Sequence, residues 1–437
     1  MYDWHYKDVI VQKPREIAYR LLTQAGGSGL FAEEILQREL GSIQLAAADR
    51  GLLQEIYYGV IRWAGTLDFL ISRKTGGKTQ KPGLRVLLQM ALYQLFWLSR
   101  IPDHAAVHET VELAKLKGFG PQAGFVNAVL RGYLRDREET SMLLERLKRD
   151  DLAVGYSHPD WLVKKWVARY GKEETTRLLT WNNTPPKVFA RINTLKISPD
   201  ELKEVWKKEG VEFTAVEWPW TTFPMVEFQG VSAVEQLESF KKGFFYIQDP
   251  STLLSVEYLE PKAGDSILDV CAAPGGKCTL IAQRMGDKGA VTAEDLAPSR
   301  IQLIEENVRR LGLNCVTARL SDGVPSGEQY DRVLVDAPCS NAGVFRRRVE
   351  LRWRISPSEV ERLRAVQLKL LKSAIAKVKP GGCLVYSTCS LEPEENEGVV
   401  MEALVAHPEM IVEKQRQLLP FADFVDGAFV AQMRKAK

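Results

Sequence analysis

The sequence predicts an α/β protein in which an all-helical N-terminal part precedes a parallel sheet with helices on both faces. Two observations support this prediction. Apolar residues recur at helical spacing along most of residues 10–140. From about residue 261, short apolar runs alternate with longer amphipathic segments, the rhythm of a parallel sheet. A chain of 437 residues is long enough for two or three domains, each with its own core.

The N-terminal helices can be placed from their boundaries. One helix is expected from "PREIAYRLL", where Pro14 occupies the first turn, and another from "DRGLLQEIYYGVIRWAGTLDFLI", with "TGGKTQKPG" as a separator. The most apolar stretch has only fourteen residues between Arg85 and Arg100, whereas a membrane span needs about 20, so we expect a buried helix. His104 and His108 lie four residues apart without a third ligand, which favours packing over metal binding.

The middle of the chain has a mixed character. "RDREETSMLLERLKRDD" predicts a linker or an exposed helix. Short strands are expected between about 160 and 260, at "KVFARINTLKIS", "EFTAVEWPW" and "GFFYIQDPST".

The C-terminal part contains the predicted parallel sheet. Its strands are expected at "SILDV", "GAVTAED", "CVTARL", "YDRVLVDAP" and "CLVYSTCS". Two helices between them are expected to end at Gly286 and Gly312, and a long later helix to begin with Ser356 or Ser358 as its cap. Sheets of this kind bind ligands at the carboxyl ends of their strands.

Charge and cysteine placement limit the classes of function. The chain has 59 basic and 56 acidic residues, so it is not a polycation, and contact with nucleic acid requires a local patch. No apolar leader segment opens the sequence. The six cysteines all follow residue 270, which predicts reduced thiols in the cytoplasm rather than a disulfide framework. They are Cys271, Cys278, Cys315, Cys339, Cys383 and Cys389.

The segment "LDVCAAPGGKCT" places small residues between a strand and a helix, where backbone amides can approach a ligand. Its spacing matches neither a dinucleotide fingerprint nor a phosphate-binding P-loop. Asp295 ends the next strand and is placed to accept hydrogen bonds from a ribose diol. A nucleoside without phosphates suggests S-adenosylmethionine, with a dinucleotide as the alternative. For Asp322, predicted to contact adenine, a solvated loop residue is an equal alternative. The predicted cofactor-binding residues are Cys271, Ala272, Ala273, Pro274, Gly275, Gly276, Lys277, Asp295, Asp322 and Asp336.

Two further cysteines follow later strands and are expected at the same edge of the sheet. Cys339 lies in "VLVDAPCSNAG" and Cys389 in "LVYSTCSLEPEEN". Carbon 5 of cytosine is too weak a nucleophile to take a methyl group until a thiolate adds to carbon 6, so thiols here indicate covalent activation of a cytosine. Asp336 is predicted to hold the base, and Lys277 to activate a thiol or orient the base. The base has to be unstacked to reach this edge. A catalytic disulfide is disfavoured because the spacing lacks C-x-x-C, and the other four cysteines are predicted to be packing residues.

A basic segment directly follows Cys339. Residues 340–354 contain five arginines and one acid, with Phe345 and Trp353 interleaved, so their net charge of +4 exceeds the +3 of the whole chain. This pattern predicts phosphate contact and base stacking on RNA, with a solvated basic loop as the alternative. The predicted RNA-binding residues are Arg346, Arg347, Arg348, Arg352 and Arg354.

These motifs together resemble a known family. "CAAPGGK", "DAPCS" and "STCS" with "EEN" behind it resemble the RNA 5-methylcytosine methyltransferases of the RsmB/Sun family, in the same order. "DRGLLQEIYYGVIRW", "PDHAAVHETVELAK" and "GFVNAVLR" resemble a NusB-type RNA-binding domain, and "ARINTLK", "YIQDPST" and "DGAFVAQMRK" also fit. The resemblance runs from about residue 14 to the end. The chain departs from it at Cys278, where threonine is usual, and in "VFRRRVELRW", which lacks a His-Pro.

The resemblance implies an organisation and a reaction. It implies a NusB-like all-α RNA-binding domain at 1–145, a helical linker at 146–180, an RRM-like α+β extension at 181–260 and a Rossmann-like class I methyltransferase domain at 261–437. It implies S-adenosylmethionine as cofactor and a cytosine of 16S ribosomal RNA, naked or in a partly assembled small subunit, as substrate. Cys389 would be the nucleophile, and Cys339 would assist elimination and product release. A monomer without membrane contact or metal is expected.

Two alternatives remain at this stage. The same chemistry on transfer RNA is disfavoured because tRNA enzymes of the group usually lack the NusB-like domain. An antitermination-type RNA-binding protein with a decayed methyltransferase domain is disfavoured because both Cys339 and Cys389 are retained together with Asp336.

Overall fold

The chain divides into two units that are not continuous in sequence. The structure is a computed structural model that describes residues 13–24, 30–230, 233–321 and 327–437. Within these ranges, the first unit comprises the chain up to Thr184 together with Phe345–Arg354, and the second comprises Pro185–Val344 and Ile355–Lys437. The arginine-rich segment therefore belongs to the unit of N-terminal helices, although it interrupts the second unit in sequence.

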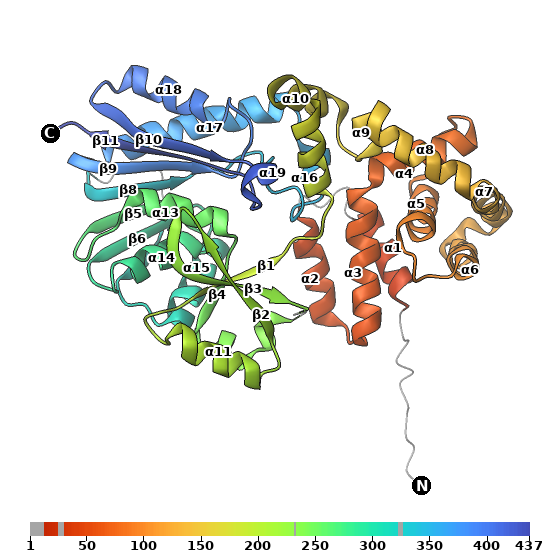
Figure 1. Cartoon of the computed structure of the whole chain (residues 1–437), viewed down its shortest axis with the longest axis horizontal. Helices are drawn as coiled ribbons and strands as arrows, with labels where there is room; N and C mark the ends of the chain where they lie inside the picture. The colour runs from red at the N-terminus through yellow and green to blue at the C-terminus, as the bar shows by residue number, and fades with distance from the viewer. Residues whose placement is uncertain (1–12, 25–29, 231–232, 322–326) are drawn as a thin grey trace, which may run out of the picture. The chain divides into compact units, whose positions relative to one another are not determined.

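The first unit is helical, as the apolar periodicity predicted (Figure 1). Gly76 ends α4 in a left-handed conformation, and Pro82 begins α5, the most apolar long helix of this unit, which lies in its core. None of the helices in the described residues is long and apolar enough to cross a membrane. The α-helices are α1 (Pro14–Gln24), α2 (Ala32–Ser42), α3 (Ala47–Arg62), α4 (Ala64–Thr75), α5 (Pro82–Trp97), α6 (Asp103–Ala114), α7 (Ala123–Arg135), α8 (Arg137–Asp150), α9 (Leu152–Gly155), α10 (Asp160–Asn182) and α16 (Leu351–Arg354), with short helices η1 (Lys115–Phe119) and η2 (Gly120–Gln122).

The second unit begins with a small antiparallel sheet of order β2-β3-β1-β4. Trp206 of α11 is fully buried in its core among the rings of Phe213, Phe228 and Phe245. The central strand β3 was not predicted, because Pro224 within it argues against a strand. The elements are β1 (Val188–Ile192), α11 (Pro199–Lys208), β2 (Glu212–Trp218), β3 (Thr221–Gln229), η3 (Val234–Gln236), α12 (Glu238–Lys241) and β4 (Phe245–Ile247).

A seven-stranded sheet of order β10-β11-β9-β8-β5-β6-β7 forms the rest of this unit. The strands from β9 to β7 are parallel, as predicted, but β11 and β10 are antiparallel additions at one edge. These two strands were not among the five predicted ones, and a connection as short as that between β10 and β11 favours an antiparallel pair. The elements are η4 (Pro250–Thr252), α13 (Leu253–Leu259), β5 (Ser266–Val270), α14 (Gly276–Arg284), β6 (Ala290–Asp295), α15 (Pro298–Leu311), β7 (Val316–Leu320), β8 (Tyr330–Asp336), α17 (Pro357–Ala376), β9 (Val378–Thr388), α18 (Glu397–Ala406), β10 (Met410–Leu418), α19 (Pro420–Asp423) and β11 (Ala428–Lys435).

Helices cover both faces of the large sheet, and alternate strand residues separate the two cores. Ile267 and Leu334 face the core shared with α13, α14 and α15, whereas Leu268 and Val333 face the core shared with α17. Successive strand residues point to opposite faces, so the apolar runs seen in the sequence are buried on both sides. The predicted helix boundaries hold at Gly312, the left-handed cap of α15, and at Ser356, whose side chain accepts from the backbone N–H of Glu359.

Candidate active site

The first feature of the site is the turn between β5 and α14, which carries the predicted cofactor-binding residues 271–277. Cys271 and Gly275 both have left-handed backbone conformations, with φ of 61° and 104°. This turn is anchored from the small sheet by Arg191 of β1, which is fully buried. The Arg191 guanidinium donates to the carbonyl of Gly276 at 2.9 Å and to Oγ1 of Thr279 at 3.1 Å. The sequence did not single out Arg191, because a lone arginine in a strand has no distinctive spacing.

Asp295 lies at the end of β6, beside this turn. Its Oδ2 accepts from the backbone N–H of Ala273 at 3.0 Å, its Oδ1 accepts from that of Leu296 at 2.8 Å, and Arg300 pairs with it at 3.2 Å. A carboxylate accepts about four hydrogen bonds, so Oδ2 retains capacity for one more. Leu296 is 70% exposed, and Leu320, which pairs with Asp295 at the end of β7, is 49% exposed. Asp322 lies outside the described residues.

Two carboxyl groups, those of Asp269 and Asp336, interact with one ammonium, that of Lys277. Lys277 Nζ lies 2.7 Å from Oδ2 of Asp336, whose Oδ1 accepts from Ser387 at 2.9 Å. Burial opposes the charge of Lys277, but Asp336 outweighs it and raises the pKa of the ammonium. Asp269, fully buried in β5, has both carboxyl oxygens without a hydrogen-bond partner. Burial, followed by the charge of Asp336, raises the pKa of Asp269 to about 8.

The two cysteines meet at the carboxyl ends of β8 and β9. The sulfurs of Cys339 and Cys389 lie 3.3 Å apart. The hydrogen bond to Cys389, followed by burial, raises the pKa of Cys339 well above its ordinary value, so Cys339 is a protonated thiol at neutral pH. Oδ1 of Asn341 accepts from Cys389 Sγ at 2.9 Å. Gly343 packs directly on the Cys389 carbonyl, where a Cβ atom would lie only 2.7 Å from the oxygen.

Glu395 connects the loop that contains Cys339 with the loop that contains Cys389. Its carboxylate is fully buried and accepts from the backbone N–H of Ser340 at 2.8 Å and from Nε2 of Gln367 at 2.9 Å. The hydroxyls of Ser340 and Ser390 both donate to its Oε2. Ser340 and Ser390 are the residues that directly follow Cys339 and Cys389, so one carboxylate holds both loops. The sequence showed Glu395 within "EEN" but gave no reason to assign it this position.

The arginine segment differs from its prediction. Arg352 is fully buried and donates to Asn183 Oδ1 at 2.6 Å and to the carbonyl of Asn182 at 2.9 Å. Arg346 is 2% exposed and lies over the Trp181 ring at 4.0 Å. The enclosure of both guanidinium groups within the first unit argues against the expected contact of Arg346 and Arg352 with RNA phosphates.

The apolar part of this segment is also packed. Phe345, predicted to stack on a base, is fully buried and contacts the rings of His158 and Trp166. Trp353 is partly exposed at 38%, and its Nε1 donates to the carbonyl of Ile61 at 2.8 Å. Arg347, Arg348 and Arg354 are the half-buried or exposed members of the predicted set; Arg348 pairs with Glu33 at 3.1 Å, and Arg354 donates to the carbonyl of Leu30 at 2.7 Å.

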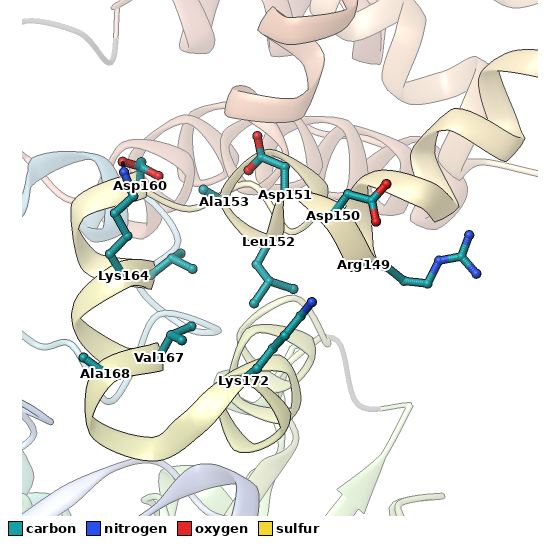
Figure 2. Close-up of a pocket in the computed structure, with 11 residues that line it drawn as sticks. Arg149, Asp150, Asp151, Leu152, Ala153, Asp160, Lys164, Val167, Ala168 and Lys172 are labelled. Atoms are coloured by element: carbon teal, nitrogen blue, oxygen red, sulfur yellow. Dashed lines mark ion pairs between the residues drawn. The ribbon is translucent and has the colours of Figure 1, made fainter.

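A separate hollow lies within the first unit, between the end of α8, α9 and α10 (Figure 2). Charges of both signs line it, and Asp160 pairs with Lys164 at 2.7 Å. It contains none of the residues predicted from the sequence, and its mixed charge does not fit a phosphate-binding patch. The lining residues are Arg149, Asp150, Asp151, Leu152, Ala153, Asp160, Val163, Lys164, Val167, Ala168 and Lys172.

The residues at the sheet edge fit S-adenosylmethionine. Asp295 offers an acceptor for a ribose hydroxyl, and the exposed Leu296 and Leu320 offer apolar surface to a base. Asp269 and Asp336 are carboxyl groups that interact with each other and with Lys277, and a positively charged sulfonium or ammonium near them would favour ionisation of Asp269. No group of three or more metal-ligating side chains is arranged to hold a metal ion in the part of the chain that the structure describes.

Comparison with protein families covers most of the sequence. The model of the 16S rRNA methyltransferase RsmB/F family matches residues 256–434, the NusB family model matches residues 12–135, and the ferredoxin-like domain of RsmF/B-like methyltransferases matches residues 158–221. A protein of Bacillus subtilis (strain 168) described as "Probable ribosomal RNA small subunit methyltransferase B" is 36% identical over 445 residues. That alignment covers 96% of this chain and 98% of the relative.

Solved structures show the same fold. The structure described as "Crystal Structure of PH0851" matches with a TM-score of 0.79 and 24% identity, covering 97% of this chain and 99% of the other. The structure of NSun6 from Pyrococcus horikoshii with SFG matches with a TM-score of 0.59 and 26% identity, covering 64% of this chain and 98% of the other.

Proposed function

Because the chain belongs to the RsmB/F family of S-adenosylmethionine-dependent 16S rRNA methyltransferases, we propose that it methylates carbon 5 of a cytosine through a covalent cysteine–cytosine adduct. Membership gives methylation of small-subunit ribosomal RNA, and the earlier resemblance is confirmed. The atom that is methylated and the covalent step are the proposal. One observation carries it: two thiols whose sulfurs lie 3.3 Å apart at the ligand-binding edge. Methylation of a base nitrogen or a ribose oxygen requires no thiol.

The protonation of the two thiols supports Cys389 as the nucleophile. Cys339 keeps its proton at neutral pH because of Cys389 and of burial. It is also only 8% exposed, whereas Cys389 is half-buried. A thiol that holds its proton donates a hydrogen bond and does not compete for carbon 6, so Cys339 is suited to assist its neighbour during elimination.

The reaction then uses this chain's residues in sequence. Deprotonated Cys389 adds its sulfur to carbon 6, the 5,6 double bond opens, and carbon 5 gains the electron density with which it bonds to the methyl group. S-adenosylmethionine, which residues 271–277 and Asp295 would hold, would supply that methyl group as an electrophile, with S-adenosylhomocysteine as the co-product. Loss of the carbon 5 proton to a base restores the double bond and expels Cys389 as a thiolate.

Asp336 and Lys277 are proposed to orient the base and the cofactor. Ser387 and Lys277 fix both oxygens of the Asp336 carboxylate, which keeps acceptor capacity toward the N3 side and the amino group of cytosine. Residues 271–277 with Asp295 are proposed to hold the cofactor. Arg347, Arg348 and Arg354 are proposed to contact RNA. The enclosed Arg346 and Arg352 are not part of this proposal.

The test is methyl transfer to under-methylated 16S rRNA and to small subunits, with transfer RNA as a comparison. Cys389→Ala is expected to be inactive and to form no adduct, whereas Cys339→Ala accumulates a denaturation-resistant protein–RNA adduct. Cys315→Ala, a thiol outside the site, is the matched control and is expected to retain normal activity. Near-normal turnover by Cys389→Ala, or a methyl group on any atom other than carbon 5 of cytosine, would overturn the proposal.

A further inference from the structure

Asn341 has an unusual position between the two thiols. It follows Cys339 by two residues, yet its side chain reaches Cys389 on the neighbouring loop, with 2.9 Å between Oδ1 and Sγ. Its backbone has φ of 59°, in the left-handed region where glycine is favoured and asparagine is tolerated. The residue at this position can therefore be reduced to glycine without a conformational penalty.

The orientation of the Asn341 carboxamide is fixed by its second contact. Its Nδ2 donates to the carbonyl of Cys339 at 2.7 Å. If the amide were turned over, two carbonyl oxygens would face each other at that distance without a hydrogen between them. The oxygen of the carboxamide, not its nitrogen, therefore faces Cys389. An amide oxygen only accepts hydrogen bonds, so Asn341 stabilises the thiol form of Cys389 and offers nothing to a thiolate.

The carboxamide is not needed to hold the loop in place. Ser340 is tied to Glu395 by its backbone N–H and its hydroxyl, and the N–H of Gly343 donates to the carbonyl of Cys389 at 2.9 Å. These contacts fix the loop on both sides of Asn341. The Asn341 side chain can therefore accept a hydrogen bond from the Cys389 sulfur without being required for the shape of the loop.

We propose that Asn341 is a positioning residue for the catalytic thiols, whose carboxamide oxygen accepts a hydrogen bond from the Cys389 thiol and directs it in the free enzyme. The inference rests on the proposed function, in which Cys389 is the nucleophile. Among the described residues, Lys277 interacts electrostatically with Cys389, and Glu395 and Tyr386 interact with Cys339.

The test compares Asn341→Gly with Asn341→Asp in the full-length chain. Iodoacetamide is the probe, and carboxamidomethylation of the Cys389 peptide is followed by mass spectrometry between pH 6 and 10. Asn341→Gly removes the acceptor and is expected to raise the alkylation rate at pH 7 about threefold to tenfold, the size of one neutral hydrogen bond. Asn341→Asp places a charged acceptor there and is expected to lower that rate at least about threefold. The acid limb of the pH profile of kcat/KM for methyl transfer is expected to move to lower pH in Asn341→Gly and to higher pH in Asn341→Asp.

The two variants separate an electrostatic role from a structural one. Both lose the bond to the Cys339 carbonyl, so a structural role predicts that both change the alkylation rate in the same direction. That result, or rates within twofold of the unchanged chain for Asn341→Gly, would overturn the inference. Thermal unfolding of both variants checks that each is folded, and Asn341→Ser, which restores an acceptor, is expected to fall between Asn341→Gly and the unchanged chain. An active Cys389→Ala would instead overturn the proposed function.

Discussion

Replacing Glu395 tests whether the spacing of the two thiols depends on one buried carboxylate. Glu395→Gln keeps the shape of the side chain and removes its charge, and Glu395→Ala removes both. Glu395 accepts from two groups of Ser340, from Ser390 and from Gln367, and it touches neither sulfur. It is therefore a positioning residue, and its loss is expected to affect the cysteine loops first.

The loss in the free energy of unfolding depends on which of the hydrogen-bond donors to Glu395 can find another acceptor. In Glu395→Ala the two serine hydroxyls, 3.1 Å apart, can bond to each other, and Gln367 retains its bond to the Pro338 carbonyl. The backbone N–H of Ser340, the second N–H of Gln367 and one of the two serine hydroxyls are left without an acceptor, at about 1–3 kcal/mol each. With the cavity, we expect the free energy of unfolding to fall by at least about 4 kcal/mol. Glu395→Gln exchanges charged for neutral hydrogen bonds but no longer buries a charge, so about 1–2 kcal/mol is expected.

The functional effect is expected to be larger than the loss of stability. A displacement of reacting groups by about 1 Å costs about 100-fold in rate, so single-turnover methyl transfer by Glu395→Gln is expected to fall about 10-fold to 100-fold. The KM values for RNA and cofactor should stay within about twofold, because the carboxylate does not face either ligand. Glu402→Gln, which loses an ion pair with Arg364 on the same face of the sheet, is the matched control. Methyl transfer within twofold of normal in Glu395→Gln would refute the reasoning, and so would an equal loss in both variants.

Three other substitutions test the charges at and away from the site. Arg352→Met leaves several buried carbonyls without a donor, so the free energy of unfolding measured by calorimetry is expected to fall by about 3–5 kcal/mol. Arg354→Gln, at a more exposed position, is expected to change stability little. A smaller salt dependence of RNA binding in Arg352→Met would show that Arg352 contacts phosphate. Burial raises the pKa of Asp269 in the folded chain to about 8, whereas the pKa of the unfolded carboxyl is about 3.9. The contribution of Asp269 to stability is therefore complete below about pH 4 and is lost as pH rises toward 8. Asp269→Asn should therefore gain in melting temperature relative to the unchanged chain between pH 5 and 9, and parallel curves would contradict the raised pKa. Lys277→Met removes the cation from Asp336, so methyl transfer is expected to fall at least about 10-fold, with the exposed Lys288→Met unaffected; unchanged turnover would exclude Lys277 from the site.

The sequence was most informative where a short motif occupies the end of a predicted strand. The strands that end at Asp336 and Thr388 are neighbours in the sheet, and residues past such ends share one edge. That rule alone predicts that Cys339 lies near Cys389, and that Asp295 lies near the turn at Gly275. It could not supply Arg191, Asn341 or Glu395, because each acts through a contact with a residue far away in sequence. Their residue types have no spacing that distinguishes them from ordinary polar residues.

The arginine segment shows why charge by itself misleads. A guanidinium group satisfies its donors equally well on phosphate oxygens and on backbone carbonyls, so the five arginines are compatible with either environment. The apolar residues among them carry the distinguishing signal. Phe345 and Val349 are four positions apart, and both are buried within the first unit, together with Arg352. Aromatic rings that stack on bases have to be exposed before RNA arrives, and Phe345 is not. A basic run whose apolar residues are buried is therefore better interpreted as part of a core than as a surface for RNA.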